Sequence, residues 1–260
     1  MLKSERPIVM AIGGHDPSGG AGIQADMEAI SYTGSYPVTV ITCLTIQDTQ
    51  NVEAIQLVDA DFMQQQAEKI LADMPVSAFK LGLLGSIEVV DVVCRLLKKY
   101  KHIPVVCDPV LAAGGGKNLS NRPLIEHIKE HLFPLVNLLT PNIPEAIQLG
   151  IARQNNDDGS LIFEQQLCEN ILITGAHSHS DENYVHNTLY SKGKQHSQSS
   201  WRRLDHEYHG SGCTLAANIA GWIAQGFSLQ YAIGKGQEFT WNSLKRAQQL
   251  GQGQLIPYRL

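Results

Sequence analysis

The alternation of short apolar runs with helix-length amphipathic stretches constrains this chain most. Apolar runs such as residues 8–12 and Val105–Cys107 are separated by segments with helical periodicity, such as Ile87–Lys99. Strands that are covered on both faces form short, nearly continuous apolar runs, and the covering helices lie between them in the chain. The pattern therefore predicts an α/β fold, with a central, mostly parallel sheet flanked by helices on both faces.

The same periodicities place the elements. Strands are expected over residues 8–12, 38–44, 52–58, 79–84, 105–107, 135–140 and 171–174, and helices over 21–32, 61–72, 87–99, 123–132, 213–225 and 229–250. Two β-type runs around Lys192-Gly193-Lys194 predict a small antiparallel hairpin of residues 184–191 and 195–203. The polar stretch 153–159 is interpreted as a surface loop.

Composition limits the class of protein and its partners. The chain has 260 residues, of which 43% are hydrophobic, and a net charge of −5, so one sizeable core and a single domain over residues 1–260 are expected. Lys and Arg are scattered and form no basic stripe, which argues against a nucleic-acid partner. No apolar run approaches the roughly 20 residues of a membrane span, which argues against a membrane partner. Five cysteines without a CxxC pair predict reduced thiols in the cytoplasm.

A glycine-rich turn, His209-Gly210-Ser211-Gly212-Cys213-Thr214, leads directly into a helical pattern. Glycines let successive N–H groups point one way, and the new helix adds its unpaired first-turn donors and its positive dipole end. This turn is predicted to be an anion site. Its positive potential is expected to lower the pKa of Cys213, which would make the thiolate a base beside a bound phosphate. The alternative is a glycine-rich helix start with a buried cysteine.

A second glycine-rich segment, residues 13–26, follows the first predicted strand. Five glycines around a helix start allow a ligand to lie against bare backbone. The spacing fits neither GxGxxG nor GxxxxGK[ST], so dinucleotide and Walker-type sites are excluded. Asp26 falls in the first turns of the helix, where the dipole favours a carboxylate even without a ligand.

Oxygen ligands follow two further predicted strands. Asp108 follows a buried run, and Thr140-Pro141-Asn142-Ile143-Pro144-Glu145 places an amide and a carboxylate three residues apart. Such donors suit Mg²⁺, which binds through one or two carboxylates, water and nucleotide phosphates. The alternative for Asn142 and Glu145 is a helix cap with its matching third-position acid.

Two other features of the sequence bear on ligand binding. Gly114-Gly115-Gly116-Lys117 predicts a mobile loop whose lysine either reaches a phosphate or is solvated. The histidines, including His177, His179 and His186, do not show the convergent spacing that zinc requires, so a histidine metal site is not expected.

Four segments occur together in one order: Gly14-His15-Asp16-Pro17-Ser18-Gly19-Gly20-Ala21-Gly22-Ile23-Gln24-Ala25-Asp26, Asp108-Pro109-Val110, Thr140-Pro141-Asn142-Ile143-Pro144-Glu145-Ala146 and His209-Gly210-Ser211-Gly212-Cys213-Thr214. In this order and spacing they resemble the hydroxymethylpyrimidine and phosphomethylpyrimidine kinase family of the ribokinase-like superfamily. The resemblance implies transfer of the γ-phosphate of ATP, with Mg²⁺, to the hydroxymethyl group of 4-amino-5-hydroxymethyl-2-methylpyrimidine in thiamine biosynthesis or salvage. It also implies a homodimer, and it leaves open a second transfer onto the monophosphate.

The resemblance also assigns residues by matched position. It implies that Cys213 is the base near the acceptor hydroxyl and that Gly210, Ser211 and Gly212 form the anion hole. The matched pyrimidine-pocket positions are Gly14, Ala21, Asp26, Gln47 and Val110. The matched positions around the phosphates are Asp108 and Glu145 for the metal, and Asn142, Thr174 and Thr214 for the nucleotide.

This chain departs from the family pattern near the phosphates. Family members commonly carry lysine where Gly114, Thr174 and Gln237 stand, although Lys117 and Lys235 lie close to two of these places. Lost charged contacts would weaken ATP binding or the second phosphorylation.

Two alternatives to the pyrimidine kinase stay open. A pyridoxal or pyridoxine kinase of the same fold would also phosphorylate a hydroxymethyl group on a flat heteroaromatic ring. Gln47 favours the pyrimidine, because an amide both donates to and accepts from an aminopyrimidine edge. The second alternative is a non-catalytic, degenerate kinase that binds a pyrimidine.

Overall fold

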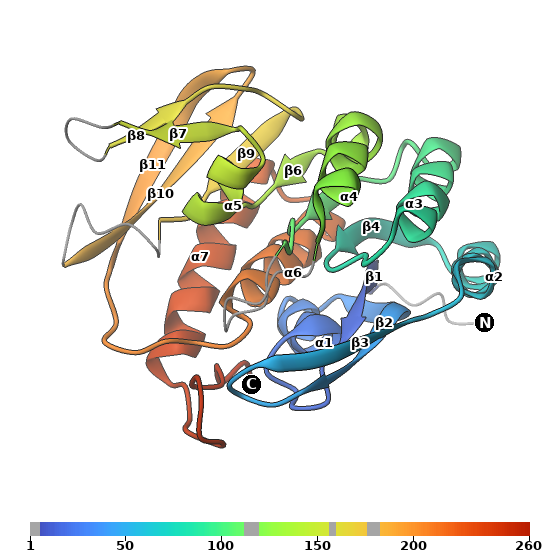
Figure 1. Cartoon of the computed structure of the whole chain (residues 1–260), viewed down its shortest axis with the longest axis horizontal. Helices are drawn as coiled ribbons and strands as arrows, with labels where there is room; N and C mark the ends of the chain where they lie inside the picture. The colour runs from blue at the N-terminus through green and yellow to red at the C-terminus, as the bar shows by residue number, and fades with distance from the viewer. Residues whose placement is uncertain (1–5, 112–119, 156–159, 176–182) are drawn as a thin grey trace.

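One sheet dominates the computed structural model, which describes residues 6–111, 120–155, 160–175 and 183–260. Within these residues its nine strands lie in the order β11-β10-β9-β6-β5-β4-β1-β2-β3 (Figure 1). The six central strands are parallel: β9 (Asn170–Ile173), β6 (Leu138–Leu139), β5 (Val105–Cys107), β4 (Val76–Leu81), β1 (Ile8–His15) and β2 (Tyr36–Gln47). The antiparallel strands are β3 (Val52–Leu57) at one edge, and β10 (Tyr184–Ser191) and β11 (Lys194–Arg202) at the other. The predicted mostly parallel sheet is confirmed.

Helices cover both faces of this sheet (Figure 1). One face carries α1 (Gly22–Tyr32), α6 (Ser211–Ala224) and α7 (Leu229–Lys245), and the other carries α2 (Ala60–Asp73), α3 (Ile87–Lys99), α4 (Arg122–His127) and α5 (Ile143–Gln148). Side chains alternate along β1 accordingly. Met10 and Ile12 join the core under α2 and α3, and Val9 and Ala11 join the core under α1 and α6. The two cores confirm the predicted helix–sheet–helix layers.

Local sequence explains individual helices, and α3 is the clearest case. The Ser86 side chain caps the helix by accepting from the N–H of Val89 at 3.3 Å. Lys98 and Lys99 in its last turn complement the negative end of the helix dipole. Its valine and leucine stripe is buried against the sheet.

The predicted surface loop over residues 153–159 is partly wrong. Ala152–Gln154 forms β7, which pairs with β8 (Leu161–Phe163) in a separate two-stranded sheet. Arg153 also forms an ion pair with Glu164 at 2.5 Å. Strands of three residues show too little alternation to be recognised in the sequence.

Several predicted elements have different bounds, and β1 and β2 in particular extend beyond the runs expected for them. The helix expected over residues 123–132 starts as α4, continues as a π-helical turn (Ile128–Leu132) and ends in a 3₁₀ turn (Phe133–Leu135). Because this last turn includes Leu135, the strand expected over 135–140 is shorter and consists of Leu138–Leu139. The strand expected over 79–84 is shifted to Val76–Leu81. The last helix ends at Lys245, because Gln248 pairs with Ile256 instead.

The hairpin of β10 and β11 is confirmed, with a shorter turn than expected. Lys192 and Gly193 have φ values of 51° and 76°, which is the left-handed pair that a two-residue turn between twisted strands requires. Lys194 therefore belongs to β11.

Candidate functional site

The carboxyl ends of the six parallel strands form one row, where open α/β sheets bind ligands. In sheet order from β9 to β2 the row holds Thr174, Asn142, Asp108, Lys80, Gly14 and Gln47, each at or near the end of its strand. Asn142 pairs directly with Thr174, whose N–H donates to Pro141 O at 2.9 Å. The predicted nucleotide residues Asn142 and Thr174 are therefore adjacent, and the predicted acceptor residues Gly14 and Gln47 lie at the other end of the row.

Two glycine-rich turns pack against each other near the end of the row formed by β1 and β2, which we call the acceptor side because the predicted acceptor residues lie there. The first turn, the acceptor turn, follows β1 and includes residues 16–22, and the second, residues 209–212, leads into α6. The end formed by β6 and β9 is called the nucleotide side. Gly210, the N-cap of α6, has a φ of 72°, and a Cβ atom there would collide with the carbonyl oxygen of Gly20. A Cβ atom on Gly20 would collide in turn with the ring of His209. The turns meet backbone to backbone, which only residues without side chains permit. The N-cap of α6 makes no side-chain hydrogen bond to the first-turn N–H groups, and helix starts of this kind can bind anions. The predicted anion site at this turn stays a prediction.

The Asp16 side chain forms hydrogen bonds with both glycine-rich turns. Its Oδ1 accepts from the N–H and the hydroxyl of Ser18, both at 2.8 Å. Its Oδ2 accepts from Ala21 N and from Nε2 of His209, also at 2.8 Å. Burial raises the pKa of this carboxyl, but the hydrogen bonds from His209, Gln47 and Ser18 outweigh it and hold the pKa far below its usual range. The sequence interpretation missed this pair, because its members are 193 residues apart.

Cys213 lies in the first turn of α6, partly exposed, between the glycine-rich turns and Asp108. The Gly22 N–H donates to its sulfur, and the thiol forms a hydrogen bond with the Asp108 carboxylate. The predicted lowering of its pKa is wrong. Burial raises the pKa of Cys213 to about 12, and although Lys80 opposes this, Asp108 and Asp26 add to it. Burial is the largest cause of this rise.

Lys80 and Asp26 form a buried ion pair next to Cys213. The Lys80 Nζ lies 2.7 Å from Oδ1 and 2.8 Å from Oδ2 of Asp26, and both residues are fully buried. Burial lowers the pKa of Lys80, but Asp26, Cys213 and Asp108 outweigh it, so the amine stays charged. Asp26, a predicted pyrimidine-pocket residue, is thus engaged by Lys80 and does not line the depression beside Gln47. A lysine inside an apolar strand was the sequence signal for a buried partner.

Asp108 and Glu145 are both buried carboxyls. Asp108 follows β5 at the centre of the row, and Glu145 lies in α5. Burial raises the pKa of Asp108 to about 6, with Asp26 adding and Lys80 opposing. Burial raises the pKa of Glu145 to about 8, and the Asp108 charge raises it further. Glu145 Oε2 accepts from Asn142 N at 2.9 Å while Asn142 Oδ1 accepts from Glu145 N, so the capping box considered as the alternative is present.

Gln237 sits in a buried neutral cluster between α7 and the hairpin. Its Oε1 accepts from Asn187 Nδ2 at 2.8 Å, from the hydroxyl of Ser199, and from Trp201 Nε1 at 3.2 Å. Asn187 Oδ1 in turn accepts from Gly175 N at 3.0 Å, next to Thr174. Three donors converge on one oxygen, so this position accommodates an amide carbonyl, whereas the family resemblance implied a lysine.

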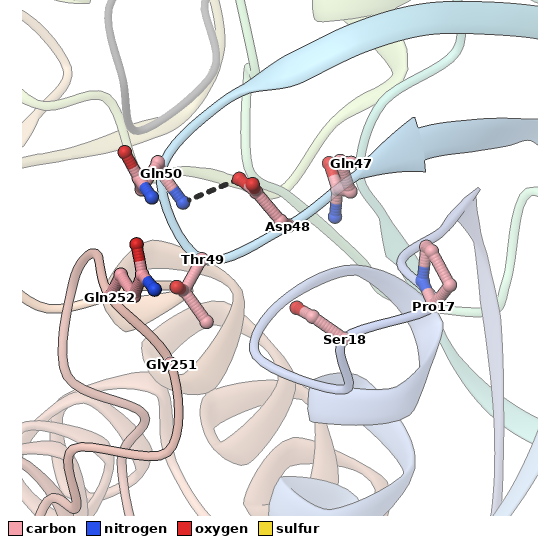
Figure 2. Close-up of a pocket in the computed structure, with 8 residues that line it drawn as sticks. All are labelled: Pro17, Ser18, Gln47, Asp48, Thr49, Gln50, Gly251 and Gln252. Atoms are coloured by element: carbon pink, nitrogen blue, oxygen red, sulfur yellow. Dashed lines mark hydrogen bonds between the residues drawn. The ribbon is translucent and has the colours of Figure 1, made fainter.

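Gln47 lines an open depression of about 520 Å³ (Figure 2). Pro17 and Ser18 of the first glycine-rich turn form one side, and Thr49 and Gln252 form the other. Of the other predicted acceptor residues, Ala21 is the N-cap of α1, but Val110 lines a separate small cavity with Leu84 and Leu111.

The Thr214 side chain is buried. Its hydroxyl donates to Gly210 O at 2.7 Å and accepts from Nε of Arg259 at 2.8 Å. Its predicted contact with a nucleotide stays a prediction. Gly114, Lys117, His177 and His179 lie outside the described residues, so the predicted glycine loop stays a prediction as well. Arg259 itself belonged to no motif in the sequence.

Comparisons with known proteins agree with this geometry. The sequence profile of the family described as phosphomethylpyrimidine kinase matches residues 16–257. A hydroxymethylpyrimidine/phosphomethylpyrimidine kinase of Haemophilus influenzae is 32% identical over 94% of this chain and 93% of its own length. A thiamine biosynthesis bifunctional protein of Geobacter sulfurreducens is 36% identical over 95% of this chain. The chain spans about half the length of that relative, 51%.

Solved structures give the same result. A phosphomethylpyrimidine kinase from Clostridium difficile superposes with a TM-score of 0.73 at 30% identity, covering 90% of this chain and 98% of its own. A Bacillus subtilis pyridoxal kinase, solved as an ADP complex, superposes with a TM-score of 0.84 at 25% identity over 98% of both chains. The resemblance found in the sequence motifs is confirmed, and this chain belongs to the phosphomethylpyrimidine kinase family.

Proposed function

We propose that this protein is an ATP-dependent kinase that phosphorylates the hydroxymethyl group of 4-amino-5-hydroxymethyl-2-methylpyrimidine in thiamine biosynthesis or salvage. One observation carries the proposal. Cys213, at an uncapped helix end, lies between a glycine-rich acceptor turn and the two buried carboxyls Asp108 and Glu145. Phosphoryl transfer depends mainly on positioning and charge stabilisation, and this arrangement provides both. The ADP complex of the Bacillus relative supports ATP as the co-substrate.

The residues at the row fit Mg²⁺. Asp108 and Glu145 are buried carboxyls with raised pKa values, which indicates incompletely balanced negative charge. No cluster of three or more His, Cys, Asp or Glu side chains suited to a metal occurs in the ranges that the structure describes. Mg²⁺ needs only one or two carboxylates when phosphates supply other oxygens, so Asp108 and Glu145 would hold it. Bound there, it would neutralise charge on the phosphate oxygens.

The chain's own groups would carry the transfer as follows. The first-turn N–H groups of Ser211, Gly212 and Cys213 would bind the oxygens of the moving phosphoryl group. Cys213 holds its proton in the free protein, so a base role requires an acceptor for that proton. Asp108 would be engaged by Mg²⁺, so the thiol proton would pass to solvent, to which Cys213 is partly exposed. The thiolate would then take the proton of the acceptor hydroxyl as the new O–P bond forms and ADP leaves.

The pyridoxal kinase alternative is favoured by one observation, the TM-score of 0.84 to the Bacillus pyridoxal kinase. The deciding experiment measures ATP consumption with the hydroxymethylpyrimidine, its monophosphate and pyridoxal in parallel. We expect the highest kcat/KM with the hydroxymethylpyrimidine. A higher value with pyridoxal would overturn the proposal in favour of that alternative. Binding of the pyrimidine without ATP consumption would indicate the degenerate kinase, which retention of Cys213 and both turns argues against.

We also propose a homodimer of single-domain chains in the cytoplasm, with small molecules rather than nucleic acid or membranes as partners. Leu44 and Ile46 on β2 are 47% and 62% exposed at the β3 edge, an apolar face that a second copy would cover. All five cysteines are free, as in a reducing compartment. Among the described helices, none has the length and apolar character to cross a bilayer. Sedimentation velocity tests the dimer, and a monomer would contradict it.

A further inference from the structure

Arg259 is one of the largest buried side chains in the described part of the chain, although it carries a charge. Its Nε donates to the Thr214 hydroxyl at 2.8 Å, and its Nη2 donates to the Gly20 carbonyl. Its Nη1 donates to Gly19 O at 3.5 Å and to Glu28 Oε2 at 3.2 Å. Burying a cation is costly unless its donors are satisfied, so these contacts explain how the structure tolerates the charge.

These contacts join the two turns around Cys213. Gly19 and Gly20 belong to the acceptor turn, whose Gly22 N–H donates to the Cys213 sulfur. Thr214 follows Cys213 directly, and its hydroxyl donates to Gly210 O at 2.7 Å. One guanidinium therefore holds the acceptor turn against the helix end that would bind the phosphoryl group.

The segment that carries Arg259 is itself anchored. Leu255 exchanges hydrogen bonds with the segment before α6, accepting from His209 N at 2.9 Å. Tyr258 N donates to Ser243 O of α7 at 3.1 Å. Gly253 N donates to the Thr49 hydroxyl at 3.0 Å, at the turn between β2 and β3, and Figure 1 shows the C-terminal end beside this hairpin. Arg259 is thus presented from a fixed backbone.

The acceptor turn depends on hydrogen bonds such as those from Arg259 because it is rich in glycine. Glycines lose more conformational freedom on folding than other residues and offer no side chains for packing. Asp16 holds the turn from within, through Ser18 and Ala21. Arg259 holds its outer carbonyls, and only a planar fork of donors reaches two carbonyls, a hydroxyl and a carboxylate at once. A lysine ammonium has fewer donors and no fixed plane.

We propose that Arg259 is a positioning residue for the acceptor, setting the distance between the first glycine-rich turn and Cys213. The proposal rests on the proposed kinase function. Residue 259 lies beyond the region that the family profile matches, residues 16–257. Because a displacement of about 1 Å at a reacting centre costs up to roughly 10²-fold in rate, the geometry of this turn should be visible in turnover.

The test compares Arg259→Lys with Arg246→Lys. Arg246 is the matched control, because its guanidinium contacts the same segment, 5.0 Å from the ring of Tyr258, without reaching the acceptor turn. For Arg259→Lys we expect kcat/KM for the acceptor to fall by about 10- to 100-fold while KM for ATP is unchanged. For Arg246→Lys we expect no change in either. Hydrogen exchange of the ligand-free protein should show faster exchange at residues 19–22 alone in Arg259→Lys.

Two results would overturn the proposal. One is wild-type turnover and wild-type exchange at residues 19–22 in Arg259→Lys. The other is equal loss of acceptor and ATP parameters with faster exchange throughout, which a purely structural role predicts. If Arg259→Lys does not fold, Glu28→Gln removes the guanidinium's partly exposed carboxylate partner, and the same acceptor-specific shift, smaller in size, is expected. An inactive wild-type protein would refute the kinase function, while the exchange measurement would still decide the role of Arg259.

Discussion

The acceptor side and the nucleotide side of the strand row balance their buried charges differently. On the acceptor side, Asp26 lies against Lys80 and Asp16 against His209, each at hydrogen-bond distance. Burial raises the pKa of Asp26, but the charge of Lys80 opposes this rise. On the nucleotide side, burial raises the pKa of Glu145 and the charge of Asp108 raises it further, while Gln237 stands in a neutral cluster. The acceptor side is therefore assembled before any ligand arrives. The nucleotide side carries negative charge that a nucleotide–metal complex would complete.

Cys213, where the two sides meet, should show the largest effect. Cys213→Ala is expected to lower kcat by about 10²–10⁴-fold, the usual loss when a proton-transfer group is removed. KM for ATP should stay close to the wild-type value, because the nucleotide side is untouched. Steady-state kinetics measures both, with Cys94→Ala in α3 as the control. Near-normal turnover of Cys213→Ala would remove the residue from catalysis.

The balance on the acceptor side is tested by Lys80→Met. This substitution leaves the Asp26 carboxyl buried without its cation, and breaking a buried pair in this way costs about 3–5 kcal/mol of unfolding free energy. Replacing both residues, as Lys80→Met with Asp26→Leu, should restore much of that loss. Urea denaturation of the three proteins gives the values. A loss below about 1 kcal/mol in Lys80→Met would mean that the pair is not what stabilises this side.

These pairs also show where sequence interpretation stops. The apolar alternation predicted the layers and the parallel sheet, and the positions of Asp108 and Asn142 after strands predicted that they meet at one edge. Lys80 and Asp26 are 54 residues apart, and Arg259 binds the carbonyl of Gly20 across 239 residues. A backbone carbonyl has no residue identity, so no pattern in the sequence marks it as a partner. The predicted lowering of the Cys213 pKa was wrong mainly because burial raises this pKa, and also because the opposing carboxylates come from distant strands and helices.

A substitution of Gln237 tests whether the neutral cluster on the nucleotide side requires an amide. Gln237→Lys introduces the lysine that the family resemblance implied, yet it removes the oxygen on which Asn187, Ser199 and Trp201 converge. Leaving buried donors unpaired costs about 1–3 kcal/mol, so we expect a lower unfolding free energy. Gln230→Lys, exposed on the same helix, is the matched control. Equal stability of Gln237→Lys and wild type would show that the cluster adapts to a cation.

Glu145→Gln should give the smallest change, and it should raise the unfolding free energy rather than lower it. The Glu145 pKa rises from 4.5 to about 8 on folding, so between these pH values the folded state binds more protons than the unfolded state. Stability is therefore lost as pH rises through this window, and glutamine, which keeps the bond from Asn142 N, removes the loss. We expect a gain of about 0.5–2 kcal/mol at pH 8 and almost none below pH 4.5.

The variant Glu145→Gln also tests whether Glu145 binds a metal ion or is only a buried carboxyl that lowers stability. If Asp108 and Glu145 hold Mg²⁺, adding Mg²⁺ at pH 8 should raise the melting temperature of the wild type, because binding to the folded state alone stabilises it. Glu145→Gln should lose most of this response, whereas Glu130→Gln, an exposed control, should keep it. A wild type that gains nothing from Mg²⁺ at pH 8 would mean that the unbalanced carboxyls require the nucleotide phosphates first. The contrast between the two sides would then lie in how tightly each holds its ligand, rather than in a preformed cation site.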